Sequence, residues 1–373
     1  MQPLDRVRKM IDYFRLIAIN IIALGLILVV IEGLTSYSLL LYDIVTMSPL
    51  ADRKHTKYDP DLGWVNVPNI YIANMYGANT FLRINSQGFR NNQDFDIVVP
   101  KGKLRIICSG DSFTLGYGVD NDHAWCELLK SFDRQLETVN IGQGGYGVDQ
   151  AYLWYKRDGS KFQHQIQLLA FITEDFLRMP SDTFHGYAKP VIKVQNDALL
   201  IKNVPVPPRT YDLSWLTENV ENLRPWRTLQ FLNRALRKVG AIRDASQSTE
   251  SVTGDTREHT KKVIRKIFDD LKHHNEKKFS RLVLVFFPLK EEVTSEGPRE
   301  WIEFIEAESK DQGIILIDLF DDFQSLPHKE VVKMFREDRH FTERGNEFVA
   351  SLLYEKLSNH PELSKVFSLN RHN

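Results

Sequence analysis

A serine stands where an open α/β protein would place its ligand. Ser112 follows Gly110 and Asp111, at the end of the apolar run 104–108 that is typical of a buried strand. Glycine lets the backbone turn sharply and leaves room for a substrate, and open sheets bind ligands at the carboxyl ends of their strands. Such a serine can also be a turn residue or a helix N-cap, so Ser112 alone does not establish chemistry.

A histidine near the end of the chain has the neighbours of a general base. His340 precedes a helical pattern, with Asp338 two residues before it and Glu337 three residues before it. An imidazole can take the proton of a serine hydroxyl, and a carboxylate beside it can hold the tautomer and stabilise the imidazolium. Thr342 is also a plausible N-cap for the last helix, so the same turn has a structural interpretation.

Strands and helices alternate along most of the chain after residue 104. The apolar patterns predict strands at 104–108, 137–141, 165–172, 282–287 and 314–319, and helices from about 122 and at 149–157, 256–276, 298–312 and 342–358. This alternation predicts a parallel sheet with helices on both faces. The serine follows the first strand and the histidine follows the last, so both are expected at the carboxyl edge of the sheet.

Residues 180–255 break this alternation. The pattern there predicts a hairpin of 191–194 and 199–204 turning at 196–197, then helices at about 214–221 and 226–239 and a polar loop. We expect an insertion that could cap the carboxyl edge of the sheet.

The amino-terminal region has the pattern of a membrane anchor. Its cations are Arg6, Arg8, Lys9 and Arg15. The apolar stretch 16–42, broken by Glu32, is long enough for the ~20 residues that cross a bilayer. A signal peptide also begins with cations, but this apolar run is longer than a signal core and no Ala-x-Ala-like site follows. The cations predict a cytoplasmic segment 1–15, an anchor 16–42, a linker and lead-in segment 43–103 and an external domain 104–373.

Composition narrows the function. The 373 residues carry 48 Lys+Arg and 49 Asp+Glu, so no global basic field attracts nucleic acid. Cys108 and Cys126 are the two cysteines, too few for a disulfide framework or a metal-ligand pattern. They could form a bridge in an oxidising compartment, but a free pair with an inert, buried Cys108 is expected. No cofactor or metal is indicated.

The motifs together resemble one family. The segments that carry the resemblance are Gly110-Asp111-Ser112, Asn140-x-Gly142-x-x-Gly145, and Asp338-x-His340 with Gly345-Asn346. They resemble the SGNH (GDSL) superfamily of hydrolases and acyltransferases, and the segments 58–64 and 83–90 resemble the lead-in of membrane-anchored bacterial members. The resemblance implies a three-layer α/β/α fold of flavodoxin-like type, with a parallel sheet, preceded here by one transmembrane helix.

The resemblance also implies residue roles. Ser112 corresponds to the nucleophile, and its own N–H to one donor of the oxyanion hole. Gly145 corresponds to the second donor, with Gly144 as the near alternative. His340 corresponds to the base.

The acidic partner has two candidates. Many family members carry an acid three residues before the histidine, which is Glu337 here, and others carry Asp-x-His, which fits Asp338. We expect Asp338 to be the partner.

One departure from the family concerns the third oxyanion donor. The family has Gly-Asn-Asp after the third strand, where this chain has Thr173, Glu174 and Asp175. An ionised carboxylate cannot donate a hydrogen bond, and losing one such donor costs about 10²–10³ in rate. Another group such as the Thr173 hydroxyl could serve, Glu174 could pair with an arginine such as Arg178, or activity is low.

The sequence therefore favours a membrane-anchored serine esterase or O-acyltransferase acting on acyl (acetyl) esters of extracytoplasmic glycans or lipids. It would lie in a bacterial inner membrane as a single-pass protein, with its domain periplasmic or extracellular. The alternative is a catalytically weakened binding or accessory protein in an envelope glycan assembly, with an assembly protein as partner. A transporter accessory or sensor is a third hypothesis.

Overall fold

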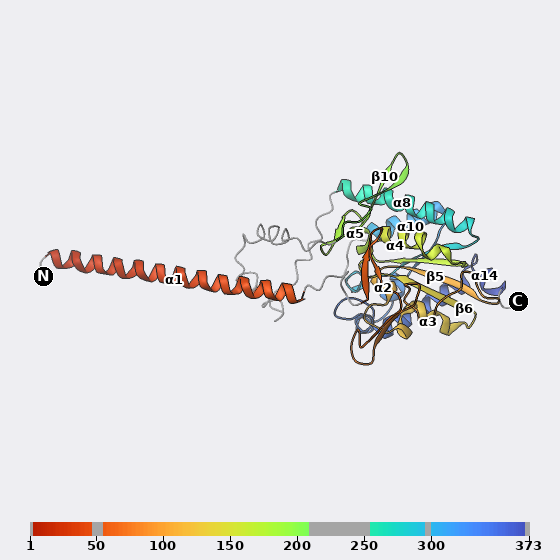
Figure 1. Cartoon of the computed structure of the whole chain (residues 1–373), viewed down its shortest axis with the longest axis horizontal. Coiled ribbons are helices and arrows are strands. Elements are labelled where there is room, and N and C mark those ends of the chain that lie inside the picture. Colours follow the sequence, from red (N-terminus) through yellow and green to blue (C-terminus); the bar gives the residue numbers. More distant parts are fainter. Residues whose placement is uncertain (1–2, 47–54, 209–253, 295–299, 370–373) are drawn as a thin grey trace. The chain divides into compact units, whose positions relative to one another are not determined.

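The computed structural model describes residues 3–46, 55–208, 254–294 and 300–369 (Figure 1). The chain divides into two compact units. One consists of residues 1–48 and 210–250, and the other of residues 49–209 and 251–373. All strands of the described residues belong to the second unit, which therefore holds the predicted site.

Five parallel strands form the central sheet of the second unit. They are β5 (Leu104–Gly110), β6 (Leu136–Gly142), β7 (Ile166–Phe171), β12 (Arg281–Phe286) and β13 (Ile315–Asp318). Their order across the sheet is β13-β12-β7-β5-β6. Numbered along the chain this is 2-1-3-4-5, the flavodoxin-like order, which confirms the predicted fold class and all five predicted strands.

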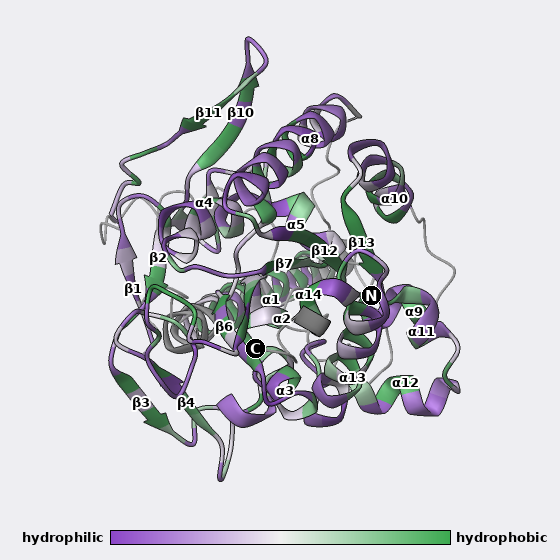
Figure 2. Ribbon diagram, turned by 90° about the vertical axis from the view of Figure 1, so that its right-hand side faces the viewer, coloured by the Kyte–Doolittle hydropathy of each residue, from purple (hydrophilic) through white to green (hydrophobic). Residues whose placement is uncertain are grey.

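Helices cover both faces of the sheet, as Figure 2 shows. On one face lie α4 (Val148–Arg157), α8 (Gly254–Lys277) and α10 (Glu300–Gln312), and on the other lie α3 (Trp125–Phe132), α12 (His328–Met334) and α13 (Glu343–Asn359). Successive strand residues point to opposite faces, so β5 supplies Ile107 to the first core and Ile106 to the second. Burial on both faces explains why the sheet strands read as continuous apolar runs.

The remaining strands pair as short antiparallel hairpins. They are β1 (Thr56–Asp59) with β2 (Gly63–Asn66), β3 (Ile70–Ala73) with β4 (Phe81–Ile84), β8 (Thr183–Phe184) with β9 (Tyr187–Ala188), and β10 (Val191–Gln195) with β11 (Ala198–Lys202). The last pair confirms the predicted hairpin. Asn196 and Asp197 at its turn both have positive φ, as a type I′ turn requires. The helices predicted at 214–221 and 226–239 lie outside the described residues.

Short helices connect these elements. They are α2 (Ser112–Leu115), α5 (Thr173–Arg178), α9 (Lys290–Thr294), α11 (Phe320–Gln324) and α14 (Ser364–Leu369), with 3₁₀ turns η2 (Asn121–His123) and η3 (Gly159–Lys161). The helix predicted from about residue 122 is thus the turn η2 followed by α3.

The described part of the first unit is one long helix, α1 (Pro3–Thr46). Its segment Arg8–Ser38 is long and apolar enough to cross a membrane, and an amino-terminal signal sequence has the same features.

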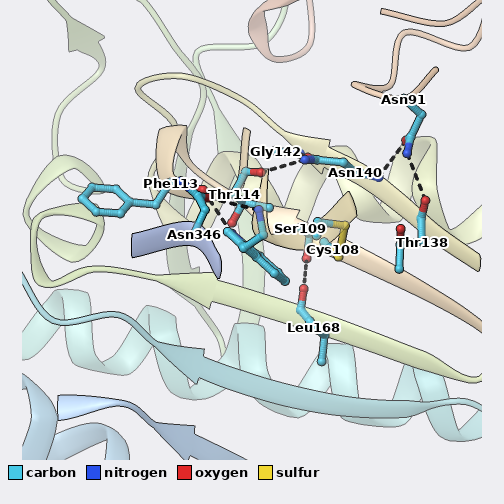
Figure 3. The surroundings of a disulfide bond; sticks show 12 residues. Asn91, Cys108, Ser109, Phe113, Thr114, Thr138, Asn140, Gly142, Leu168 and Asn346 are labelled. Atoms are coloured by element: carbon cyan, nitrogen blue, oxygen red, sulfur yellow. Dashed lines mark hydrogen bonds between the residues drawn. A yellow bond between two sulfur atoms is a disulfide. The ribbon is translucent and has the colours of Figure 1, made fainter. Parts of the chain in front are cut away.

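The expected free pair of cysteines is wrong, because Cys108 and Cys126 form a disulfide (Figure 3). Their Cα atoms are 6.3 Å apart, within the range that a disulfide spans. The bond joins β5, which leads to Ser112, to α3. The sequence spacing could not show that the two thiols are close, because β5 and α3 come together only in the folded domain.

Candidate active site

Ser112 begins α2 directly after β5. β5 has β6 on one side and β7 on the other, and the chain order reverses there, which is the switch point where open α/β sheets bind ligands. Asp111 caps the short helix, its Oδ1 accepting the N–H of Phe113 at 2.8 Å. Ser112 is 8% exposed, so its hydroxyl is nearly enclosed.

Two buried polar side chains hold the nucleophile turn. The Arg90 guanidinium donates to the carbonyls of Leu115 and Gly116, and to that of Val119 at 2.5 Å. Asn140 of β6 donates from Nδ2 to the carbonyl of Thr114 at 2.8 Å, as Figure 3 shows. The turn after β5 is therefore fixed by hydrogen bonds that water does not reach.

The structure brings His340 to Ser112. The imidazole Nε2 lies 2.9 Å from Ser112 Oγ, and Nδ1 lies 3.3 Å from Asp338 Oδ1. The rings of Phe113 and Tyr117 pack on the imidazole, with centroid distances of 5.1 and 4.6 Å. Serine, imidazole and carboxylate thus follow one another as in a nucleophile, base and orienting acid.

Burial lowers the pKa of His340 below its ordinary value, although the nearby carboxylates of Asp111 and Asp338 raise it. A lowered pKa keeps the imidazole neutral at pH 7. Only the neutral imidazole can accept the serine proton.

The two candidate acids are placed differently. Glu337 is exposed, whereas Asp338 contacts the imidazole. The Asp338 side chain is itself 40% exposed and also accepts from Arg336 Nε at 3.2 Å. The geometry therefore favours Asp338 as the acidic partner of His340. Its contact with the imidazole is longer and more hydrated than that of a buried triad acid.

The glycines after β6 lie beside the nucleophile turn, where Gln143 donates its N–H to the carbonyl of Gly110 at 3.1 Å. The N–H of Gly144 is taken by the Gln143 side chain at 2.9 Å. The hydrogen bonds of the described residues leave the N–H groups of Gly145 and Ser112 without an acceptor. Gly145, at φ 78°, is therefore better placed than Gly144 to donate to an oxyanion.

The Glu174 carboxylate lies near two arginines. Its Oε1 lies 2.8 Å from Arg339 Nη1, and its Oε2 lies 3.5 Å from Arg178 Nη2. The Thr173 side chain hydrogen-bonds to Glu292. The Thr173 hydroxyl, considered above as a substitute for the missing donor, is therefore already engaged.

Behind Ser112 lies a cluster of buried charge. Asp111 Oδ2 is 3.3 Å from Ser112 Oγ and 3.7 Å from Arg178 Nη1. Asp175 accepts from the same Arg178 nitrogen at 2.6 Å and from the N–H of Ile172 at 3.1 Å. Burial raises the pKa of the Asp111 carboxyl and raises that of Asp175 well above its usual range, where the nearby Asp111 charge adds to the effect. The carboxylates of Asp111 and Asp175 are thus occupied by hydrogen bonds from backbone N–H groups and by the Arg178 guanidinium.

Three arginines around the site were not singled out from the sequence. They are Arg90, Arg336 and Arg339. Arg90 ends the segment 83–90, which was given no part in the site. Arg336 and Arg339 lie within four residues of His340, a signal that becomes meaningful only when their partners are known. Arg178, which was named as a possible partner of Glu174, lies 3.5 Å from it.

One group outside the site has the spacing of metal ligands. Donor atoms of Asp120, His123 and Glu343 lie within 4.8 Å of one another. Asp120 Oδ1 already accepts from the N–H groups of Asp122 and His123, at 2.9 and 3.1 Å. Its present bonds are those of a cap on η2.

Fold and side chains together define a class of protein: a parallel α/β domain with a serine–histidine pair at its switch point. Solved structures that match the fold include GDSL lipolytic proteins and acetyl xylan esterases. No protein-family model and no curated protein matches the chain.

Three of these structures illustrate the similarity. A lipolytic protein of the G-D-S-L family from Veillonella parvula DSM 2008 is 15% identical, covers 69% of this chain and 99% of its own, and has a TM-score of 0.39. The acetyl xylan esterase AlAXEase is 15% identical, with coverages of 68% and 100% and a TM-score of 0.42. A lipase/acylhydrolase from Enterococcus faecalis is 13% identical, with coverages of 68% and 95% and a TM-score of 0.35. At these sequence identities and TM-scores, the activity and substrate of these proteins cannot be assigned to this chain.

Proposed function

We propose that this protein is a membrane-anchored serine esterase or O-acyltransferase that uses Ser112, His340 and Asp338. The observation that carries the proposal is the 2.9 Å contact between Ser112 Oγ and His340 Nε2 at the switch point of the sheet. A lone serine or histidine is common on a protein surface. A nearly enclosed serine within hydrogen-bond reach of a neutral imidazole is the arrangement of a nucleophile with its general base.

The reaction begins at Ser112. As Oγ attacks the ester carbonyl, His340 Nε2 takes the hydroxyl proton, and Asp338 stabilises the imidazolium. The tetrahedral intermediate collapses when the imidazolium returns the proton to the leaving alkoxide, which departs as an alcohol. Water, or the hydroxyl of an acceptor, then attacks the acyl-serine by the same steps in reverse. Hydrolysis and transfer differ only in which hydroxyl arrives.

The N–H groups of Ser112 and Gly145 supply the oxyanion hole in this proposal. Both lack an acceptor among the described residues, and the segment after β6 that contains Gly145 lies beside the nucleophile turn, where Gln143 N–H donates to the carbonyl of Gly110. Preorganised donors of this kind contribute a large part of the stabilisation of the transition state.

The disulfide supports an extracytoplasmic location for the second unit. Disulfides persist in oxidising compartments and are rare in the cytoplasm. Together with the cations before the apolar segment of α1, it favours a cytoplasmic segment 1–15 and an anchor 16–42 in a bacterial inner membrane. The lead-in 43–103 and the domain 104–373, with its insertion at 180–255, would then face acylated glycans or lipids of the envelope.

The test is covalent labelling of the full-length protein in detergent with an alkyl phosphonate that reacts with activated serines. We expect one adduct on the peptide that contains Ser112, and none in Ser112→Ala. Absence of an adduct on the folded wild-type protein would refute the esterase.

One observation favours the second candidate, a weakened binding protein. Glu174 stands where the resembled family has its third oxyanion donor. A folded protein that neither reacts with phosphonate nor hydrolyses small acetyl esters, yet binds acetylated glycans, would establish this alternative.

A further inference from the structure

The loop that carries His340 is short and closed at its base. Phe335 and Phe341 form an isolated antiparallel bridge, and the N–H of Arg336 donates to the carbonyl of His340 at 2.8 Å. Within this loop Arg339 has φ 74°, a left-handed conformation that is unfavourable for residues other than glycine. Arg339 directly precedes His340, so contacts from outside the loop that stabilise this conformation also affect the position of the imidazole.

Two carboxylates hold the Arg339 side chain. Glu174 of α5 lies 2.8 Å from its Nη1, and Glu291 of α9 lies 3.2 Å from its Nε. Glu174 is 31% exposed and Arg339 is 28% exposed at their side chains, so water screens this pair only in part. The loop is thereby tied to two helices that follow neighbouring strands, β7 and β12.

We propose that Glu174 is a positioning residue for the base, acting through Arg339 on His340; this proposal rests on the esterase function proposed above. At the position where the resembled family has its third oxyanion donor, this chain has a clamp on the catalytic loop. The carboxylate is then not a defect in the oxyanion hole. It fixes the backbone conformation that directs the imidazole to Ser112.

The opposite side of the loop has its own attachment. Arg336 donates from Nη1 to the carbonyl of Gly118 at 2.8 Å, which ties the loop to the segment after the nucleophile turn. Its Nε also contacts Asp338. With Arg336 on one side and Arg339 on the other, the imidazole is held between two arginine attachments. Release of one allows the left-handed residue to relax and the ring to leave Ser112.

The experiment compares substitutions at both ends of the clamp in the full-length protein, with kcat and KM for a small acetyl ester as readouts. Glu174→Gln removes the charge at nearly constant shape, and Arg339→Gly removes the side chain while favouring the left-handed backbone. A misplaced catalytic group typically costs 10-fold to 10²-fold, so we expect each to lower kcat about 10-fold or more with KM changed less than twofold. The double variant should be no worse than the more impaired single variant, and Arg339→Lys should retain part of the activity.

Glu174→Asn separates this proposal from the lost-donor interpretation. It places the family's donor at the site but breaks the clamp, so we expect kcat to fall. A rise in kcat would overturn the proposal, and so would additive losses in the double variant. Glu330→Gln is the matched control, because Glu330 also pairs with an arginine, Arg344, away from the base. It should leave kcat unchanged.

Hydrogen exchange of residues 335–342 gives a readout that does not depend on catalysis. We expect faster exchange of this segment in Glu174→Gln, with α13 unchanged. Unaltered exchange would overturn the clamp. If the wild-type protein fails the phosphonate test but exchange still accelerates, the esterase is refuted while Glu174 stands as the clamp of this loop.

Discussion

The two halves of the candidate site are built in different ways. The nucleophile turn is held by buried, mostly uncharged acceptors, with Arg90 and Asn140 donating to backbone carbonyls. The base loop is held at its surface by two arginines: Arg339 forms an ion pair with Glu174, and Arg336 donates to the carbonyl of Gly118. The nucleophile turn is therefore part of the buried core, while the base loop is fastened to the domain by contacts at the surface.

This difference separates stability from catalysis. Exposed ion pairs each stabilise a fold by only ~0.2–1 kcal/mol and weaken as salt is added, whereas buried hydrogen-bonded groups are costly to disturb. Changes to the groups that hold the nucleophile turn should then mainly lower stability, and changes near His340 should alter turnover in a protein that stays folded.

The largest effect is expected from the base itself. His340→Ala should lower kcat by about 10⁴-fold or more, because the serine loses its proton acceptor. The half-exposed loop should accept the smaller side chain, so the thermal midpoint of the second unit should change little. Steady-state rates and thermal unfolding measure both. Turnover within 10-fold of the wild type would exclude His340 as the base.

A stability effect should dominate on the nucleophile side. Removing the disulfide with Cys108→Ala and Cys126→Ala should lower the free energy of unfolding by about 3 kcal/mol, since the bond closes a loop of 18 residues. Urea unfolding of the full-length protein measures this loss. The phosphonate adduct on Ser112 should still form in the folded fraction. An unchanged unfolding midpoint would show that the bond does not form in the native protein.

The two acids before the histidine should differ in their effect. Asp338→Asn should lower kcat by about 10²-fold, less than the ~10⁴-fold that a buried orienting carboxylate provides, because Asp338 is hydrated and its contact with the imidazole is long. Glu337→Gln is the natural control and should change little. The reverse ranking would transfer the role to Glu337.

The smallest effect concerns pH. Burial lowers the pKa of His340 below its ordinary value, so the acid limb of kcat/KM, where the imidazole becomes protonated, should lie at lower pH than for an ordinary imidazole. Asp338 raises that pKa, so Asp338→Asn should move the acid limb to still lower pH. An acid limb at or above pH 7 would contradict the burial of the imidazole in the working enzyme.

The central sheet could be predicted from the sequence because each of its strands is buried on both faces and reads as an apolar run. The pairing of Ser112 with His340 followed from the same pattern, since residues after parallel strands meet at one edge. The hairpin at Asn196 and Asp197 had a turn signature of its own.

What could not be predicted depends on long-range geometry. Two cysteines 18 residues apart say nothing about whether their Cβ atoms face each other, so the disulfide required the packing of α3 on β5. The partners of Arg339 lie on α5 and α9, far from it in the chain. A flexible arginine can reach many carboxylates, and only the fold selects among them. The five-residue helix α11 and the seven-residue helix α12 between residues 319 and 342 are too short for a clear period.

The sequence separation of 228 between Ser112 and His340 has a consequence for biogenesis. Synthesis at ~5–20 residues per second delivers the histidine roughly 10–45 s after the serine. In the esterase that we propose, the growing polypeptide throughout that interval carries a serine without its base and cannot cleave an ester. A chain that ends before residue 340, through premature termination or proteolysis, stays inert toward acyl groups. Catalytic competence therefore appears only in molecules whose synthesis has passed the final strand of the sheet.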